Sequence, residues 1–147
     1  MTLYPDLENK IVLVTGSGSG IGKAQALRFA AEKSQVLVND IDPEAAKQTC
    51  AEANANGFSA IPVPADVSNS EDVDQMFNQI ESELGEVQIL VNNAGLVSPM
   101  LHFFEADEAW WRRIIDVNLT GHFLCCLLYT SDAADEGLGV DLGGRRI

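Results

Sequence analysis

The chain has 147 residues, which is enough for one domain and too few for two. Nine basic residues against 22 acidic ones give a net charge of −13, so we expect no nucleic-acid partner and no anionic membrane surface. No apolar run approaches the ~20 residues needed to cross a bilayer. The first ten residues do not resemble a signal peptide, and the three cysteines have neither zinc nor disulfide spacing. We therefore expect a cytoplasmic protein without a metal.

The predicted elements alternate short apolar runs with longer amphipathic stretches, as in consecutive βαβ units. Strands are predicted at 11–14, 36–38, 58–63 and 87–91, and the last helix at about 107–124. Pro62 cannot donate to a ladder, which places the third strand at a sheet edge, as in the doubly wound order 3-2-1-4. The sequence predicts an α/β fold: a Rossmann-type, doubly wound parallel sheet, truncated after the fourth strand and the helix that follows it.

The helices carry their own start and packing signals. Asp42 followed by proline is typical of a capped helix start, and Ser68-x-x-Glu71 predicts a capping box for the next helix. That helix has an apolar stripe at helical spacing, which comprises Val73, Met76, Phe77, Ile80 and Leu84. In the first helix a similar pattern predicts a packing face made of Ile21, Ala24, Leu27 and Ala31, with Lys23, Arg28 and Glu32 off that face.

A glycine-rich turn lies between the first predicted strand and the first helix. Residues 15–22 read Thr-Gly-Ser-Gly-Ser-Gly-Ile-Gly. Glycines let a backbone turn tightly and approach phosphate, and a helix N-terminus attracts anions, so this context predicts a dinucleotide pyrophosphate site. The predicted cofactor-binding residues of the turn are Gly16, Ser17, Ser19, Gly20, Ile21 and Gly22.

Asp40 closes the second predicted strand, 18 positions after Gly22. This is near the ~20-residue offset at which an acidic side chain reaches the adenosine ribose. A carboxylate there accepts hydrogen bonds from both ribose hydroxyls and repels a 2′-phosphate, by about 4 kcal/mol at ~4 Å and an effective dielectric of ~20. No basic residue lies in the turn or directly after Asp40, so Asp40 and Ile41 predict NAD rather than NADP. The alternative is a plain loop acid before Asp42.

Four motifs in this order together resemble the short-chain dehydrogenase/reductase family, over about residues 7–124. They are Thr15-Gly16-x-x-x-Gly20-Ile21-Gly22, Asp66-Val67, Asn92-Asn93-Ala94-Gly95 and the segment Asp116-Val117-Asn118-Leu119-Thr120-Gly121. The resemblance implies that Asp66 and Val67 contact the adenine ring, and that the backbone of Asn93, Ala94 and Gly95 passes close to the cofactor ribose. It also implies a small-molecule alcohol or ketone as substrate of the full-length parent, and a homo-oligomeric parent.

The resemblance also implies a catalytic apparatus that this sequence does not contain. Asn118 would support a proton relay toward a catalytic lysine; the alternative is an ordinary polar helix residue. The family's serine and Tyr-x-x-x-Lys pair should follow Asn118, yet the only tyrosines are Tyr4 and Tyr129, and no lysine follows Lys47. Residues 126–147 instead resemble a translated sequencing-library adapter. We therefore predict an NAD-binding Rossmann portion at 1–125 and a non-native tail at 126–147.

Two functional hypotheses follow from this reading. The first is a fragment of an NAD-dependent oxidoreductase that moves hydride between nicotinamide and a secondary alcohol or ketone, with the fragment itself inactive. The alternative is a nucleotide-binding module, or an inert fragment, without catalytic activity. A fourth strand without a neighbour would present an apolar edge, which predicts a poorly stable polypeptide.

Overall fold

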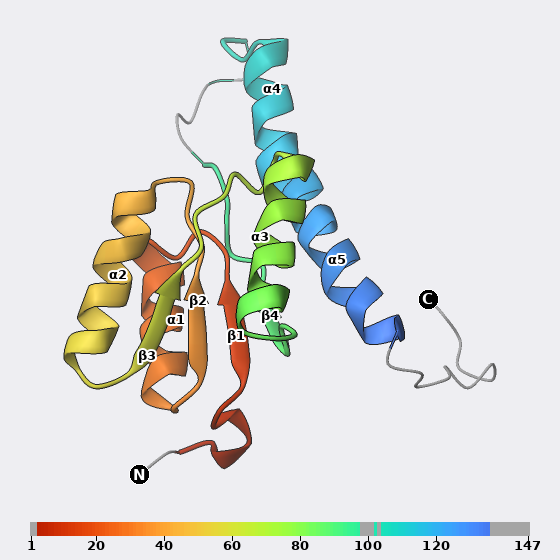
Figure 1. Ribbon diagram of the computed structural model, residues 1–147. Helices are drawn as coiled ribbons and strands as arrows, with labels where there is room; N and C mark the ends of the chain where they lie inside the picture. The colour runs from red at the N-terminus through yellow and green to blue at the C-terminus, as the bar shows by residue number, and fades with distance from the viewer. Residues whose placement is uncertain (1–2, 98–101, 103, 136–147) are drawn as a thin grey trace.

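A computed structural model describes residues 3–97, 102 and 104–135 of the chain. Its core is a four-stranded, wholly parallel sheet in the order β3-β2-β1-β4, which confirms the predicted order (Figure 1). The strands are β1 Ile11–Val14, β2 Gln35–Val38, β3 Ser59–Pro62 and β4 Ile89–Val91. Pro62 lies on the edge strand, opposite Val38, where its missing N–H is tolerated.

The helices alternate with the strands along the chain, as the βαβ pattern predicts. Their bounds are η1 Pro5–Leu7, α1 Gly20–Ala31, α2 Pro43–Ala55, α3 Ser70–Glu83, α4 Glu108–Ile115, the π-helical turn η2 Asp116–Thr120, and α5 Gly121–Asp135. None of the helices in the described part of the chain is long and apolar enough to cross a membrane.

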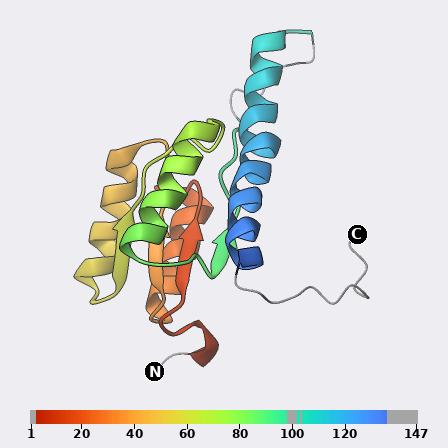
Figure 2. The same cartoon turned by 45° about the vertical axis from the view of Figure 1, so that its right-hand side comes forward.

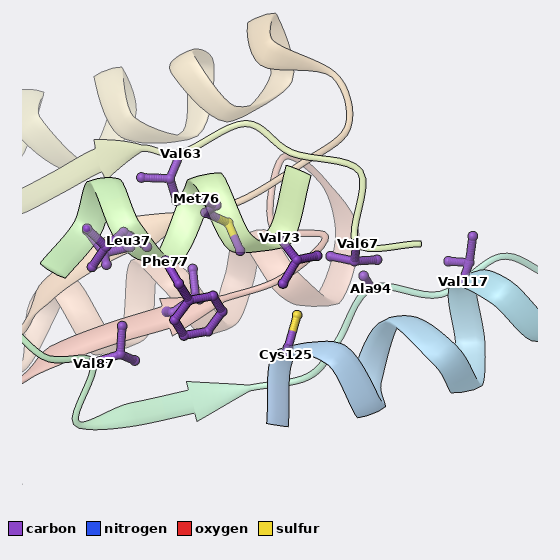
Figure 3. Close-up of a cluster of buried hydrophobic side chains, with 12 residues drawn as sticks. Leu37, Val63, Val67, Val73, Met76, Phe77, Val87, Ala94, Val117 and Cys125 are labelled. Atoms are coloured by element: carbon purple, nitrogen blue, oxygen red, sulfur yellow. The ribbon is translucent and has the colours of Figure 1, made fainter. Parts of the chain in front are cut away.

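The two faces of the sheet are covered by different helices. Side chains of a strand alternate between faces, and here the valines of β1 and β2 face α1 and α2 while Leu13 and Leu37 face α3 and α5. The α1/α2 cluster is built around Val12, Val14, Ala26, Ala30, Val36, Val38, Ala46, Cys50, Ala53 and Ala60. Figure 3 shows the other cluster, in which Phe77 of α3 and Cys125 of α5 both lie.

The predicted packing face of α1 is wrong at Ile21 and Ala24, which are exposed, whereas Leu27 does pack against the α1/α2 cluster. Ile21 is 74% exposed, while the buried positions of this helix are Gly22, Ala26 and Ala30. Apolar periodicity misses this face because the helix packs through its smallest side chains. Glu32, predicted to lie off the face, is 2% exposed: its Oε2 accepts the N–H groups of Leu3 (2.7 Å) and Tyr4, and its Oε1 pairs with Arg28.

Of the two predicted caps, one is confirmed and one is displaced. Asp42 caps α2 by accepting the N–H of Glu44 at 2.9 Å. The predicted capping box of α3 is wrong by one residue, because Asn69 is the N-cap and accepts the N–H groups of Glu71 and Asp72. Ser68 instead turns toward Asp66. Of the predicted stripe of α3, Val73, Met76, Phe77 and Ile80 are buried, and Leu84 is partly buried and packs against the same core cluster.

The last predicted helix is longer than expected and is interrupted. Asp107 caps α4 through the N–H of Trp110, and α4, η2 and α5 then run on as one rod beside α3 (Figure 2). At Gly121 the rod touches the loop after β3: an added Cβ would lie 2.9 Å from Val67 Cγ2. The helix continues past residue 125, so the proposed boundary of the tail falls inside α5.

Candidate cofactor-binding site

A cavity of about 280 Å³ opens at the carboxyl ends of the strands. This is the edge at which ligands bind in open α/β sheets. The predicted site residues that line it are Gly16, Ser19, Asp40, Ile41, Asp66, Val67, Asn93, Ala94 and Gly95. Of the remaining predicted residues, Ser17 is buried beneath the turn, where its Oγ donates to Val14 O at 2.7 Å. Segments far apart in the sequence therefore meet at one site.

The glycine turn interlocks with the loop after β4. The Thr15 hydroxyl oxygen accepts the N–H groups of Asn93 and Ala94, both at 3.0 Å, and the Asn93 amide donates to the carbonyls of Thr15 and Gly16. Gly16 has φ +60°, and a Cβ there would lie 2.7 Å from Ala94 Cα. A Cβ on Gly22 would collide with the Asn93 amide and Gly16 O. Glycine is thus required at both positions by close backbone approach.

The N-terminus of α1 differs from those of the helices that follow it. Each of α2, α3 and α4 is capped by its own N-cap side chain and has an acidic residue in its first turn. In α1 the N-cap Ser19 makes no side-chain cap hydrogen bond, and the first turn has no acidic residue. The space beside Gly20 is open, with nothing within 4 Å of an added Cβ. This open, uncapped helix start fits an anionic phosphate group.

Asp40 is held rigidly at the end of β2. Its Oδ2 accepts the N–H of Gly18 at 2.9 Å and its Oδ1 accepts that of Asp42 at 3.0 Å. Gly18 must be small, since its added Cβ would lie 2.8 Å from Oδ2. Each carboxylate oxygen has further acceptor capacity, so the aspartate can still receive hydroxyl donors from the cavity.

Asp66 closes the other side of the cavity, after β3. Its Oδ1 accepts both the N–H (2.9 Å) and the hydroxyl (2.6 Å) of Ser68, and Arg113 Nη1 lies 3.4 Å from its Oδ2. Partial burial raises the pKa of this carboxyl, but the Ser68 hydrogen bonds and the Arg113 charge outweigh it, so the pKa lies below its usual value. Asp66 is therefore an ionised acceptor at neutral pH.

Asn118 lies outside the cavity lining and is fully engaged by the backbone. Its Oδ1 accepts Leu96 N–H at 2.6 Å and its Nδ2 donates to Leu96 O at 2.9 Å. One turn further along, His122 Nε2 lies 2.8 Å from Ala94 O. Asn118 and His122 thus fix the loop after β4 against the long helix. Tyr129 is far from this region of the fold, because its hydroxyl donates to Gln88 O before the start of β4.

Three polar residues that shape the site were not among the predicted site residues. Thr15 belongs to the quoted motif, and its hydroxyl organises the loop after β4. Asn39 is 1% exposed and donates to Val63 O and Ala65 O, joining the ends of β2 and β3. Arg113 lines the cavity from α4. A polar residue after a strand signals Asn39, but nothing in the local sequence signals Arg113.

The parallel sheet with its flanking helices is a Rossmann-type fold, and comparison with known proteins gives the family of the chain. The sequence profile of the short chain dehydrogenase family matches residues 10–139. The chain belongs to this family. Dehydrogenases of the family use nicotinamide cofactors.

Curated relatives are dehydrogenases with different substrates in their names. The chain is 42% identical over 121 residues to (2S)-[(R)-hydroxy(phenyl)methyl]succinyl-CoA dehydrogenase subunit BbsD of Thauera aromatica, covering 81% of this chain and 48% of the relative. It is 42% identical over 125 residues to glucose 1-dehydrogenase 2 of Bacillus subtilis, covering 83% and 48%. It is 43% identical over 125 residues to 3beta-hydroxysteroid dehydrogenase 1 of Eggerthella lenta, covering 84% and 48%.

The solved structures agree with this assignment. The crystal structure of a hydroxysteroid dehydrogenase from Escherichia coli superposes with a TM-score of 0.81 at 32% identity, covering 89% of this chain and 55% of that chain. The chain therefore spans about half the length of the curated relatives and of the solved structure that it matches.

Proposed function

We propose that this chain is the NAD-binding part of an oxidoreductase whose full-length form interconverts a secondary alcohol and a ketone. NAD would supply the hydride acceptor, and the chain's own residues bind and orient it. The observation that carries the proposal is the place of Asp40: a fixed carboxylate in the same cavity as the open start of α1. Asp40 and Ile41 would take the adenosine ribose, and the N–H groups of residues 19–22 the pyrophosphate.

The preference for NAD over NADP rests on charge. A 2′-phosphate would approach the Asp40 carboxylate, whose two oxygens are held by Gly18 and Asp42 and cannot turn away without losing those bonds. The repulsion between the carboxylate and the phosphate is at most about 4 kcal/mol at ~4 Å. One third of that value already corresponds to about a tenfold preference for NAD over NADP. The adenine ring would lie against Asp66 and Val67, and the loop of Asn93, Ala94 and Gly95 near the nicotinamide ribose.

We propose that the chain as it stands binds nucleotide without catalysis. Asn118 would support a proton relay in the parent, but its partners, a serine and a Tyr-x-x-x-Lys pair, are not in the sequence. Tyr129 is held at the other end of β4 by Gln88 O, which argues against that role. The division into a native portion, 1–125, and a non-native tail, 126–147, remains part of this proposal. None of the three cysteines, all of which lie in the described part of the chain, forms a disulfide, which is consistent with a reducing, cytoplasmic setting.

For the full-length parent we propose a small-molecule alcohol or ketone as substrate, without a more specific identity, and a homo-oligomeric assembly. Relatives named for a CoA thioester, a sugar and a steroid match this chain at 42–43% identity over 48% of their length, so the similarity does not separate substrate types. A homo-oligomeric parent is supported by an apolar stripe along the outer face of the long helix. It comprises Trp111, Leu119 and Phe123, which are 58%, 63% and 60% exposed.

Fluorescence titration with NADH and NADPH tests the cofactor assignment. Wild type should enhance NADH fluorescence, and Asp40→Ala should weaken NADH binding about tenfold while reducing discrimination against NADPH. Asp74→Ala is the matched control, since it removes an exposed aspartate on α3. If wild type binds neither dinucleotide, only the alternative hypothesis of an inert fragment remains. NADH and NADPH binding that Asp40→Ala leaves unchanged would remove Asp40 from the ribose site.

A further inference from the structure

Arg113 is a cation in an otherwise acidic site. Among the described residues that line the cavity it is the only basic one, and it shares the lining with Asp40 and Asp66. It extends from the last turn of α4 to the loop after β3, where Nη1 lies 3.0 Å from Ser68 Oγ and 3.4 Å from Asp66 Oδ2. Its side chain is 45% exposed, so it is partly open to a ligand in the cavity.

The two oxygens of Asp66 are used differently. Oδ1 is occupied twice by Ser68, through its N–H and its hydroxyl. Oδ2 pairs with Arg113 Nη1 at 3.4 Å, a length that makes a loose ion pair and leaves acceptor capacity free. Ser68 holds Oδ1, and Arg113 holds Oδ2 and so limits rotation of the carboxylate. The two residues together determine the direction in which Oδ2 can accept a further hydrogen bond.

We propose that Arg113 is a positioning residue for adenine recognition: it orients Asp66 so that Oδ2 accepts the 6-amino group of the adenine ring. This inference rests on the proposed binding of a dinucleotide in the cavity. A base with a 6-oxo group would present an acceptor to the same ionised carboxylate, and two acceptors facing one another form no hydrogen bond. The Arg113–Asp66–Ser68 group therefore selects adenine over hypoxanthine.

A direct role of Arg113 in holding a 2′-phosphate is disfavoured by its neighbours. Nη1 is already shared between Asp66 and Ser68, and Asp40 adds a second negative charge to the same cavity. Two carboxylates against one guanidinium leave no net positive charge for a phosphate. The charge of Arg113 serves instead to hold Asp66 in one orientation.

The test compares NADH with reduced nicotinamide hypoxanthine dinucleotide, in which the 6-amino group is replaced by an oxo group and N1 carries a hydrogen. We expect wild type to bind the adenine form about tenfold more tightly, equal to about 1.4 kcal/mol. Arg113→Met should move the ratio of the two dissociation constants toward one, as should Asp66→Ala, because both variants lose the discrimination made at the 6-position. Arg113→Lys, which keeps the charge but not the planar fork, should give an intermediate ratio.

Arg112→Met is the matched control, because Arg112 is exposed on the same helix and pairs with Glu108 instead of a cavity residue. Circular dichroism melts of every variant monitor folding. Equal weakening of both dinucleotides by Arg113→Met, with the ratio kept, would show a merely structural residue and overturn the inference. A selective loss of NADPH binding in Arg113→Met would also overturn the inference, because it would place the guanidinium at the 2′-phosphate. Wild type that binds NADH without preference for adenine refutes this inference alone, whereas wild type that binds neither dinucleotide refutes the proposed function as well.

Discussion

The α1/α2 face and the α3/α5 face of the sheet bury their residues by opposite means. On the first, helices pack through alanines such as Ala26 and Ala30, both at most 2% exposed. On the second, α3 contributes large side chains, Met76, Phe77 and Ile80, to the cluster that holds the strand leucines. Figure 3 shows Met76 and Phe77 in this cluster with Leu37. Small side chains therefore make the contacts of α1 with β1 and β2, whereas large side chains fill the cluster under α3 and α5.

The difference matters for the site. Close packing of α1 places its N-terminus directly over the turn after β1, where Gly16 and Gly22 admit the loop after β4. The α3 side supports the loop after β3, which carries Asp66 and Val67. The face with the weakest apolar pattern is thus the one that shapes the glycine-turn end of the cavity.

The largest effect should follow truncation on the α3 face. Phe77→Ala removes a ring that is 5% exposed, and we expect a loss of about 3–5 kcal/mol in the free energy of unfolding. Urea unfolding followed by circular dichroism measures it. Glu81→Ala, at an exposed position of α3, is the control. A loss no larger than in that control would mean that this face is loosely packed.

Enlargement should be the damaging change on the α1 face. Ala26→Leu forces three carbons into a closed contact, with an expected loss of about 1–3 kcal/mol. Ala24→Leu makes the same change at an exposed position of the same helix, and should stay within about 0.5 kcal/mol of wild type. A larger loss of stability in Ala24→Leu than in Ala26→Leu would support the packing face predicted from periodicity.

The buried carboxylate at the end of α1 should make stability depend on pH. Hydrogen bonds from Tyr4 and Leu3 and the charge of Arg28, which together outweigh the effect of burial, hold the pKa of Glu32 below its usual value. A lowered folded pKa stabilises the fold above the unfolded value of about 4.3, and this contribution disappears as the pH falls through the folded pKa.

Glu32→Gln should therefore lower the melting temperature at pH 7, and the gap to wild type should close on acidification below about pH 4. Glu81→Gln, at an exposed site, serves for comparison. A gap that stays constant with pH would assign the effect to packing instead of charge.

The smallest of these effects concerns the cap of α3. Asn69→Ala removes the acceptor for the N–H groups of Glu71 and Asp72, and should cost about 1 kcal/mol in urea unfolding. Ser70→Ala, one position further on, should have little effect, because Ser70 lies inside the helix and is exposed. Equal values for the two variants would argue against Asn69 as the cap.

Much of the fold could be predicted from the sequence because its signals are local. Pro62 indicated an edge strand, Asp42-Pro43 a helix start, and the stripe from Val73 to Ile80 a buried face; all three are confirmed. The packing face of α1 was missed for a physical reason: alanine and glycine contacts leave no contrast in hydropathy between the faces of a helix.

The sequence by itself determined the parallel order of the strands, the glycine turn, and the presence of Asp40 and Asp66 at strand ends, since spacing along one segment encodes each of these. Only the tertiary structure decided the partners of those residues. Arg113 meets Asp66 across 47 positions, Asn93 meets Thr15 across 78, and Asn118 meets Leu96 across 22. Such contacts depend on how the helices pack on the sheet, which no local pattern records.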